Sequence, residues 1–248
     1  MLTQYLNVTK RLLQNPASPT ALYSDADLTT YINISRGQLA GEAECCRAIA
    51  TLDTVVGQQE YAFSALTLAN TALQGVISIS RIMYSVGTGQ KWIAPRPWPW
   101  FDLYVNNNAV PQQSWPTDWS QYGQGAAPGS TGTAGSGSFW INQPDQAYTL
   151  NCDCVCYPIA LADNTTVEAI PYLWTDAVPF FAACYALWSA QNNARMADAE
   201  RYFNTYKMFV ERARKASNPS VNRWMYSQAG DPPQAAKMQV QPRGGAGG

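Results

Sequence analysis

One stretch near the end of the chain, residues 176–216, limits the possible folds more than any other. Its apolar residues recur every three or four positions, in one set that begins at Phe180 and in a second that begins at Met196. This spacing is typical of α-helices with one buried face. Asn192 and Asn193, which are weak helix formers, separate the two sets. We therefore predict a hairpin of two helices, with one long bent helix as the alternative.

The first helix of this stretch has the features of a scaffold element. Asp176 stands where an N-cap is expected, and Pro179 is tolerated because it falls in the first turn. Several alanines follow, which would let another helix approach closely. We interpret the stretch as structural rather than catalytic.

The start of the chain predicts two more helices. Leu2 to Leu13 form an amphipathic pattern that ends before Asn15-Pro16, and a second pattern runs from a cap at Ser24 to about Cys46. Between the helical ends, a period of two replaces the helical period. We therefore expect an α+β fold, in which the N- and C-terminal helices form one bundle and an antiparallel β-region is inserted between them.

The inserted region predicts three pairs of strands. The first is a hairpin that turns at Gly57, the second a pair that turns around Gly87 to Gly89, and the third a hairpin that turns at Pro144-Asp145 and has a long second strand. A helical turn is expected at Trp100 to Tyr104. The organisation that we predict is N-terminal helices at 1–46, a β-region at 47–170 with a flexible Gly/Ser loop at 123–137, a helical hairpin at 171–217 and an extended tail at 218–248.

Composition excludes several classes of function. The chain has 248 residues, 46% of them hydrophobic and only 13% charged, and it contains no histidine. The commonest general base, nucleophile partner and metal ligand is therefore missing. No apolar run has the length of a membrane span, and no secretion signal is seen at the N-terminus. We expect a protein that is made in a reducing cytoplasm and does not enter a membrane.

The charges are unevenly distributed along the chain. From Arg195 onward there are nine Lys/Arg against four Asp/Glu, and before it there are seven against thirteen. The last fifth therefore carries +5 and the remainder −6, an asymmetry that can orient docking between copies or onto a charged partner.

Three cysteines alternate along one predicted strand, as Cys152, Cys154 and Cys156. They would share one face of the strand. Tetrahedral zinc needs four close ligands, so we favour buried, reduced thiols over a metal site. Asp163 and Glu168 are interpreted as turn and surface residues rather than as an acid/base pair. We expect no catalytic residue, no cofactor and no metal.

Several stretches in succession resemble the head-to-tail adaptor (connector) proteins of tailed phages, the group of tail tubular protein A and the gatekeeper adaptors. These stretches are DADLTTYINISRGQLAGEAECCR, the following VVGQQEYAFSAL, the central YGQGA and PDQAYTL, and the closing helices. The resemblance runs from Asp25 to Arg214 in the same order. It implies a structural virion protein of the phage neck, synthesised in the host cytoplasm.

The resemblance also implies the partners. It implies a ring, typically of twelve copies, that docks on the portal protein, connects it to the tail nozzle or tail tube, and continues the channel through which genomic DNA passes. The portal-binding parts would be helix 195–216 and tail 218–248, with these candidate residues: Arg195, Arg201, Lys207, Arg212, Arg214, Lys215, Arg223, Trp224 and Tyr226. The candidates for contact with the tail or a neighbouring subunit are Trp98, Trp100, Trp115, Trp119 and Tyr122.

One alternative function arises from the same aromatic residues. Tryptophan and tyrosine rings also stack on sugars, so a tail or receptor-binding component that binds glycans is the second hypothesis. An enzyme is the least favoured hypothesis, because no nucleophile–base pair or phosphate-binding loop can be assembled from the sequence.

Overall fold

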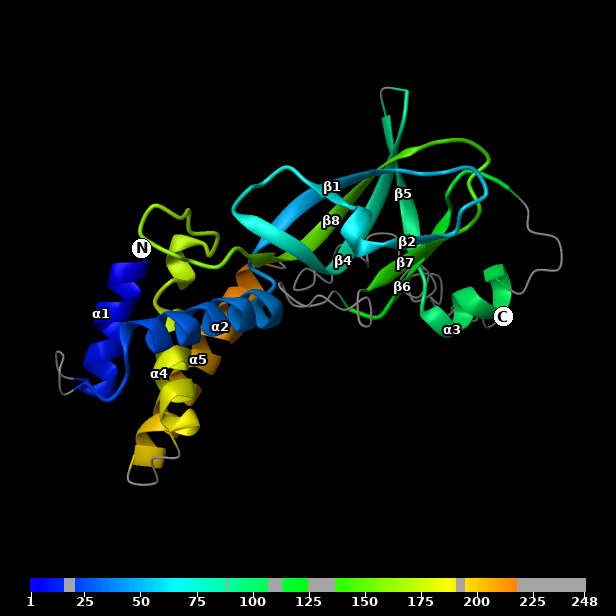
Figure 1. The fold of residues 1–248 in the computed structure, drawn as a ribbon. Helices are drawn as coiled ribbons and strands as arrows, with labels where there is room; N and C mark the ends of the chain where they lie inside the picture. The colour runs from blue at the N-terminus through cyan, green and yellow to red at the C-terminus, as the bar shows by residue number, and fades with distance from the viewer. Residues whose placement is uncertain (16–20, 88, 107–112, 125–136, 191–194, 218–248) are drawn as a thin grey trace, which may run out of the picture.

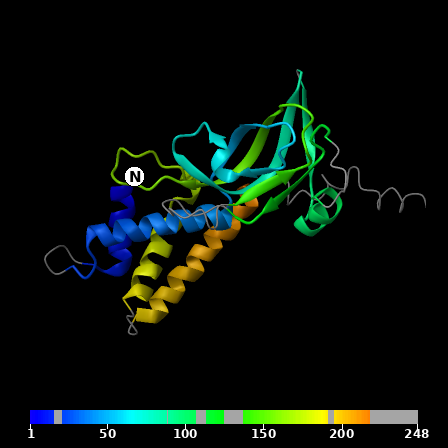
Figure 2. The ribbon, with the colours of Figure 1, turned by 45° about the vertical axis from the view of Figure 1, so that its right-hand side comes forward.

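Four helices from the two ends of the chain form one lobe of the molecule. The computed structural model describes residues 1–15, 21–87, 89–106, 113–124, 137–190 and 195–217. Figure 1 shows the helices from both ends packed together beside the sheet, and Figure 2 shows the same two lobes from another side. The bounds of the helices are α1 Leu2–Leu13, α2 Asp25–Ala43, α4 Ala177–Ser189 and α5 Met196–Ser217. The predicted bundle is confirmed.

Local sequence explains where the N-terminal helices begin and end. The Ser24 side chain accepts a hydrogen bond from the Asp27 backbone N–H, and the Asp27 carboxylate accepts one from the Ser24 N–H. This capping box starts α2. The helix ends at Ala43 because Glu44 adopts a left-handed conformation, so it is about three residues shorter than predicted. Gln14 ends α1 in the same way.

Helices α4 and α5 are separate and pack against each other as the predicted hairpin. The alternative, one long bent helix, does not occur. Buried rings join the two helices, with the Phe181 and Tyr206 centroids 4.8 Å apart and those of Phe180 and Phe209 6.1 Å apart. Asp176 is the N-cap residue of α4, as predicted, although its side chain makes no capping hydrogen bond. α5 has 22 residues and is therefore about 33 Å long.

The second lobe is a curled sheet of eight strands in the order β2-β7-β6-β5-β4-β8-β1-β3. Its first and last strands are joined in the chain by one short 3₁₀ helix, η1, so the sheet bends back on itself. All named pairs are antiparallel except β5 with β6. The strands are β1 Arg47–Asp53, β2 Glu60–Ala62, β3 Thr67–Leu68, β4 Leu73–Val86, β5 Gly89–Pro95, β6 Asp118–Tyr122, β7 Ser138–Ile141 and β8 Thr149–Pro158. The short helical segments are η1 Phe63–Ala65, α3 Trp98–Phe101, η2 Asp102–Asn106 and η3 Tyr172–Trp174.

Two of the three predicted strand pairings were wrong. β1 pairs with β8 and β3 rather than with β2, and β2 pairs with β7. β7 pairs with β6 and β2 rather than with the long strand β8. The turn at Gly57 exists, since Gly57 has a φ of 76°, but it sends the chain to the opposite end of the strand order. The β4–β5 hairpin and the helical turn near Trp100 are confirmed.

β8 lies between β1 and β4 and carries the three alternating thiols. Cys152, Cys154 and Cys156 are fully buried and free, as predicted. On the other face of the strand, Asp153 forms ion pairs with Arg47 on β1 and Arg81 on β4. The Asp153 Oδ2 atom lies 2.5 Å from Nη2 of Arg47 and 3.4 Å from Nη2 of Arg81. Within the described ranges, no helix is both long enough and apolar enough to cross a membrane.

Candidate functional site

Helix α5 offers one basic, outward-facing stripe. Its buried residues, among them Tyr202 and Tyr206, turn one side of the helix toward the bundle. The opposite side exposes a row at helical spacing: Arg201, Asn204, Met208, Arg212 and Lys215. We call this row the α5 stripe. It contains three cations, and the Met208 side chain at its centre is 53% exposed. Glu200 and Glu211 are also exposed on this side of the helix.

Arg195 does not belong to this surface. Its guanidinium donates to the backbone carbonyls of Leu13 and Leu12, at 2.6 and 3.2 Å, and pairs with Asp198. These carbonyls end α1, where the helix itself supplies no partner. Arg195 therefore holds α1 against α5, and its predicted contact with the portal stays a prediction.

The remaining predicted portal contacts divide into two groups. Lys207 and Arg214 are exposed on α5 beside the stripe, with the Lys207 ammonium 4.3 Å from the centre of the Phe203 ring. Arg223, Trp224 and Tyr226 lie outside the described residues. The tail that carries them starts after Ser217, whose carbonyl accepts a hydrogen bond from Arg47 at 3.4 Å.

A second surface, at the far end of the sheet lobe, is aromatic. Trp98 lies among three rings, with centroids 4.7 Å from Tyr122, 5.3 Å from Trp140 and 6.3 Å from Phe101. Trp100 lies 5.2 Å from Tyr104. We call Trp98, Trp100, Tyr104 and Tyr122 the aromatic shelf. The α3–η2 segment and β6 bring these residues together, although a long stretch of chain separates them.

Two other predicted aromatic contacts have different surroundings. Trp119 is only 4% exposed and belongs to the core of the sheet, so the isolated chain does not present it to a partner. Trp115 is 57% exposed, with the Lys91 ammonium 5.6 Å from its ring centre. Arg96 similarly lies 4.6 Å from the Trp100 ring. Cations therefore cover one face of the outer tryptophans.

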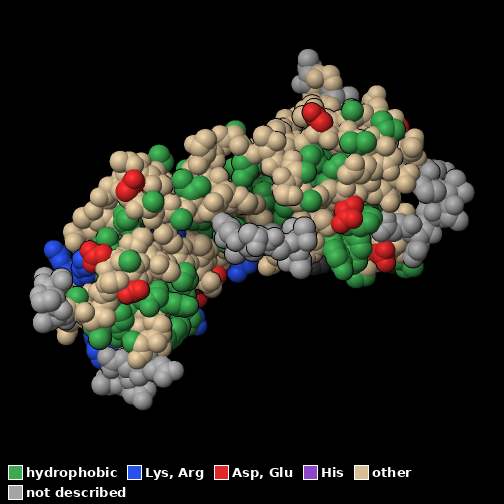
Figure 3. Space-filling model, in the orientation of Figure 1, with side chains coloured by type: hydrophobic (Ala, Val, Ile, Leu, Met, Phe, Trp, Pro, Cys, Tyr) green, Lys and Arg blue, Asp and Glu red, His purple; other side chains and the backbone are tan. Residues whose placement is uncertain are grey.

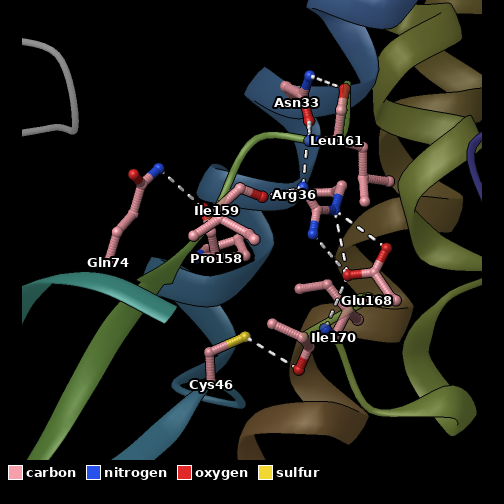
Figure 4. Close-up of polar contacts among 10 residues, drawn as sticks. Asn33, Arg36, Cys46, Gln74, Pro158, Ile159, Leu161, Glu168 and Ile170 are labelled. Carbon is pink, nitrogen blue, oxygen red and sulfur yellow. Dashed lines mark hydrogen bonds and ion pairs between the residues drawn. The ribbon is translucent and has the colours of Figure 1, made fainter. Parts of the chain in front are cut away.

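The two lobes are joined through a buried ion pair that the sequence did not predict. Figure 4 shows Arg36 of α2 reaching across to Glu168, which lies in the segment between β8 and η3. The Arg36 side chain is 1% exposed and that of Glu168 is 9% exposed. Arg36 also donates to the carbonyl of Ile159 at 2.7 Å, and Glu168 accepts from the backbone N–H of Ile170.

Asp163 and Glu168 therefore have different environments. Asp163 accepts hydrogen bonds from Thr165 and Thr166 in a surface turn, as expected, and these bonds lower its pKa to about 2. Glu168 is buried, so its prediction as a surface residue was wrong. Burial, together with the nearby Glu168 carboxylate, raises the pKa of Tyr5.

An open groove of about 660 Å³ lies beside this junction, between α2 and the ends of β4 and β8. Gly37 and Gly41 of α2, Ile77 of β4 and Tyr157 of β8 are among its lining residues. A Cβ atom added at Gly37 would lie 3.9 Å from Tyr157, which is ordinary contact. The groove was not visible in the sequence, since it depends on how α2 packs on the sheet.

The described residues offer little that suggests catalysis. They contain no cluster of three or more His, Cys, Asp or Glu side chains placed to hold a metal ion. The thiols are buried, and burial raises the pKa of Cys152 to about 12 and that of Cys156 to about 11. Thiolates, the nucleophilic form of cysteine, are therefore disfavoured at these two positions of β8. At Cys45, a hydrogen bond with Cys46 lowers the pKa instead.

Residues 2–232 match the family described as SU10 adaptor protein. The match covers nearly the whole chain, both lobes included. The chain belongs to this family. It is thus a phage adaptor protein, a structural component of the virion. No curated protein sequence matches this adaptor. The narrower resemblance to tail tubular protein A stays a prediction.

The charges of the adaptor are unequally shared between its lobes. On the face drawn in Figure 3, most of the visible Lys and Arg side chains lie over the helical lobe. In the sequence of the sheet lobe, residues 47–170, four Lys/Arg stand against eight Asp/Glu. In the described helical lobe, residues 1–46 and 171–217 of the sequence, nine Lys/Arg stand against eight Asp/Glu. The sheet lobe is therefore acidic and the helical lobe nearly neutral, with its cations concentrated on α5.

Proposed function

We propose that this adaptor forms a ring, of about twelve copies, that docks on the portal protein at the phage neck and connects it to the tail. The ring would continue the channel for genomic DNA, which passes through without sequence-specific binding. The observation that carries the proposal, besides the family, is that the α5 stripe and the start of the C-terminal tail lie on the same helix.

The α5 stripe combines cations with an exposed apolar side chain, Met208. Glu200 and Glu211 are exposed on the same side of the helix, so the feature that favours a docking surface is the exposed methionine, a residue enriched at interfaces. A partner that covers α5 meets the tail directly after Ser217. The portal partner that fits this surface is acidic, with an apolar centre that takes up the methionine.

The sheet lobe then faces a neighbouring copy or the tail. It is acidic overall, so it attracts the cations of the α5 stripe on an adjacent copy in a head-to-tail ring. The aromatic shelf gives this contact its apolar part, since tryptophan and tyrosine are enriched in the buried centres of interfaces.

The shelf is less suited to the alternative function, glycan binding. Sugars stack on open ring faces, but Trp98 is already packed against three other rings. The Trp100 ring has Arg96 on one face. A glycan array with the purified adaptor tests this alternative, and strong, selective binding would favour it.

The first experiment is co-purification of the adaptor with the portal protein of the same phage, followed by electron microscopy. We expect a ring of adaptors below the portal, with α5 at the contact. Arg212→Glu should weaken co-purification at least tenfold. Arg11→Glu, which makes the same change at an exposed site on α1, serves as the control. If no complex forms, or if both variants bind alike, portal docking through α5 is wrong.

A further inference from the structure

The groove beside α2 has the shape and chemistry of a peptide site. Its volume of about 660 Å³ falls within the ~300–1,000 Å³ of sites that hold drug-sized ligands. The absence of side chains at Gly37 and Gly41 exposes the helix surface, against which Ile77 and Tyr157 supply apolar walls. Amide side chains also line it, those of Gln38 and Gln74 among them, and these can bond a peptide backbone.

Arg36 and Glu42 both line the groove, but they have different kinds of hydrogen-bond partner. The guanidinium of Arg36 is saturated by Glu168, Asn33 and the Ile159 carbonyl. Glu42, at the C-terminal end of α2, accepts hydrogen bonds from Tyr206 and Gln38, both uncharged. Within the described residues Glu42 forms no salt bridge, so the groove presents a carboxylate at one end and favours a positively charged ligand.

The chain that follows Ser217 starts at the end of α5, the helix that also contacts Glu42 in the groove. Ser217 is held by Arg47, the first residue of β1. Tyr206, which contacts Glu42, lies eleven residues earlier on α5, or about 17 Å along the helix. Trp224 is seven residues beyond Ser217, so an extended chain carries it at most about 25 Å. It can therefore reach the half of the groove at Gly37 and Gly41.

The residues at that distance fit what the groove offers. Arg223 is the single charged residue between Asn218 and Gly230, and it immediately precedes Trp224, Met225 and Tyr226. Aromatic side chains bury about 150–250 Å² each, which makes them effective anchors for a short segment. A cation followed by three large apolar residues matches a carboxylate followed by apolar walls.

We infer that Arg223–Tyr226 occupies the α2 groove of its own chain before assembly, with Arg223 facing Glu42 and Trp224 against Gly37 and Gly41. The proposal goes beyond portal docking and does not depend on it. Where both hold, the portal takes over a segment that the free adaptor keeps against its own junction, so docking and release of the groove are coupled.

Disulfide trapping in the full-length protein, without portal protein, tests this proposal. Gln38→Cys introduces a thiol at an exposed groove position, and Ser227→Cys introduces one next to Tyr226. Asn204→Cys, exposed on the α5 stripe, replaces Gln38→Cys in the matched control. The native thiols of the described residues are buried and do not compete. Linked peptides are quantified by mass spectrometry after mild oxidation at low protein concentration.

We expect the Gln38–Ser227 pair to form an intramolecular disulfide at least ten times faster than the control pair. Adding Trp224→Ala and Tyr226→Ala should lower that rate to the control rate. Equal rates for the two pairs would overturn the proposal. Disulfide-linked dimers as the main product would also overturn it, because the groove would then take the tail of another copy. Failure of portal co-purification leaves these outcomes unchanged.

Discussion

Arg36 and Glu168 are joined by a bidentate ion pair in which Nη2 lies 2.7 Å from Oε1, and both side chains are at least nine-tenths buried. The pair connects α2 to the segment that leads from β8 back to the helices. It therefore fixes how the sheet lobe is held on the bundle.

Breaking this pair from one side should destabilise the adaptor strongly. Glu168→Ala leaves a buried guanidinium without its counter-charge, and we expect a loss of about 3–5 kcal/mol in the free energy of unfolding. Urea unfolding measures this loss. The double variant Arg36→Met/Glu168→Leu should recover most of the stability. A loss below 1 kcal/mol for Glu168→Ala would show that the pair does not hold the junction.

The same substitution should destabilise the adaptor at Arg195 and have little effect on its stability at Arg212. Arg195→Gln removes the clamp on the α1 carbonyls, so we expect a loss of about 1–3 kcal/mol in stability. Arg212→Gln, on the exposed α5 stripe, should change stability by less than about 0.5 kcal/mol. Thermal unfolding of the two variants side by side checks this. Similar effects would contradict the separation of clamp from stripe.

The buried thiols predict a loss of stability at alkaline pH. Burial raises the pKa of Cys152 and Cys184 to about 12, above the ordinary thiol value of about 8.5. At a pH below that ordinary pKa, the thiols are protonated in both the folded and the unfolded chain, and their full contribution to the free energy of unfolding is present. Above it, the unfolded chain releases protons that the folded chain keeps, so stability falls by up to about 1.4 kcal/mol per pH unit and thiol.

Urea unfolding between pH 7.5 and 9.5 measures this slope. Cys184→Ala should flatten it, while any loss of packing shifts the curve without changing its slope. Thiol-reactive dye should label the described cysteines of the native protein slowly at pH 8 and rapidly in urea. Fast labelling of the native protein would mean that the core opens readily.

Trp98 and Trp115 allow a comparison within the aromatic end of the sheet lobe. Trp98 contacts three rings, so Trp98→Ala should cost about 2–3 kcal/mol. Trp115 is more than half exposed, so Trp115→Ala should cost less than about 0.5 kcal/mol. Equal losses in urea unfolding would show that the shelf is not a packed cluster.

The sequence predicted which segments are helices and strands better than it predicted which strands pair. Caps and periodicity are local, and they placed α1, the start of α2 and the α4–α5 hairpin. β1 and β2 are close in sequence, yet each pairs with a strand that lies elsewhere in the sheet. Strand partners depend on burial across the whole lobe, and alternation within a strand contains no such information.

Local sequence patterns also predicted only part of the candidate surfaces. Exposed cations on α5 could be placed from helical spacing, because the buried face was evident. Arg195 could not, since its partners are carbonyls about 180 residues away. Trp119 and Trp115 are four residues apart and equally aromatic, but only the fold shows that one is in the core. The Arg36–Glu168 pair and the groove likewise depend on long-range packing.

The curled sheet has a consequence for copies that have not yet been assembled. The strands at the two ends of its order, β2 and β3, are only three and two residues long and are linked through η1. Long exposed edges recruit strands from other molecules and lead to aggregation. The two end strands are too short to act as such an edge. Strand pairing through them is therefore disfavoured, and growth of the adaptor into a larger structure has to come from side-chain contacts with a correct partner.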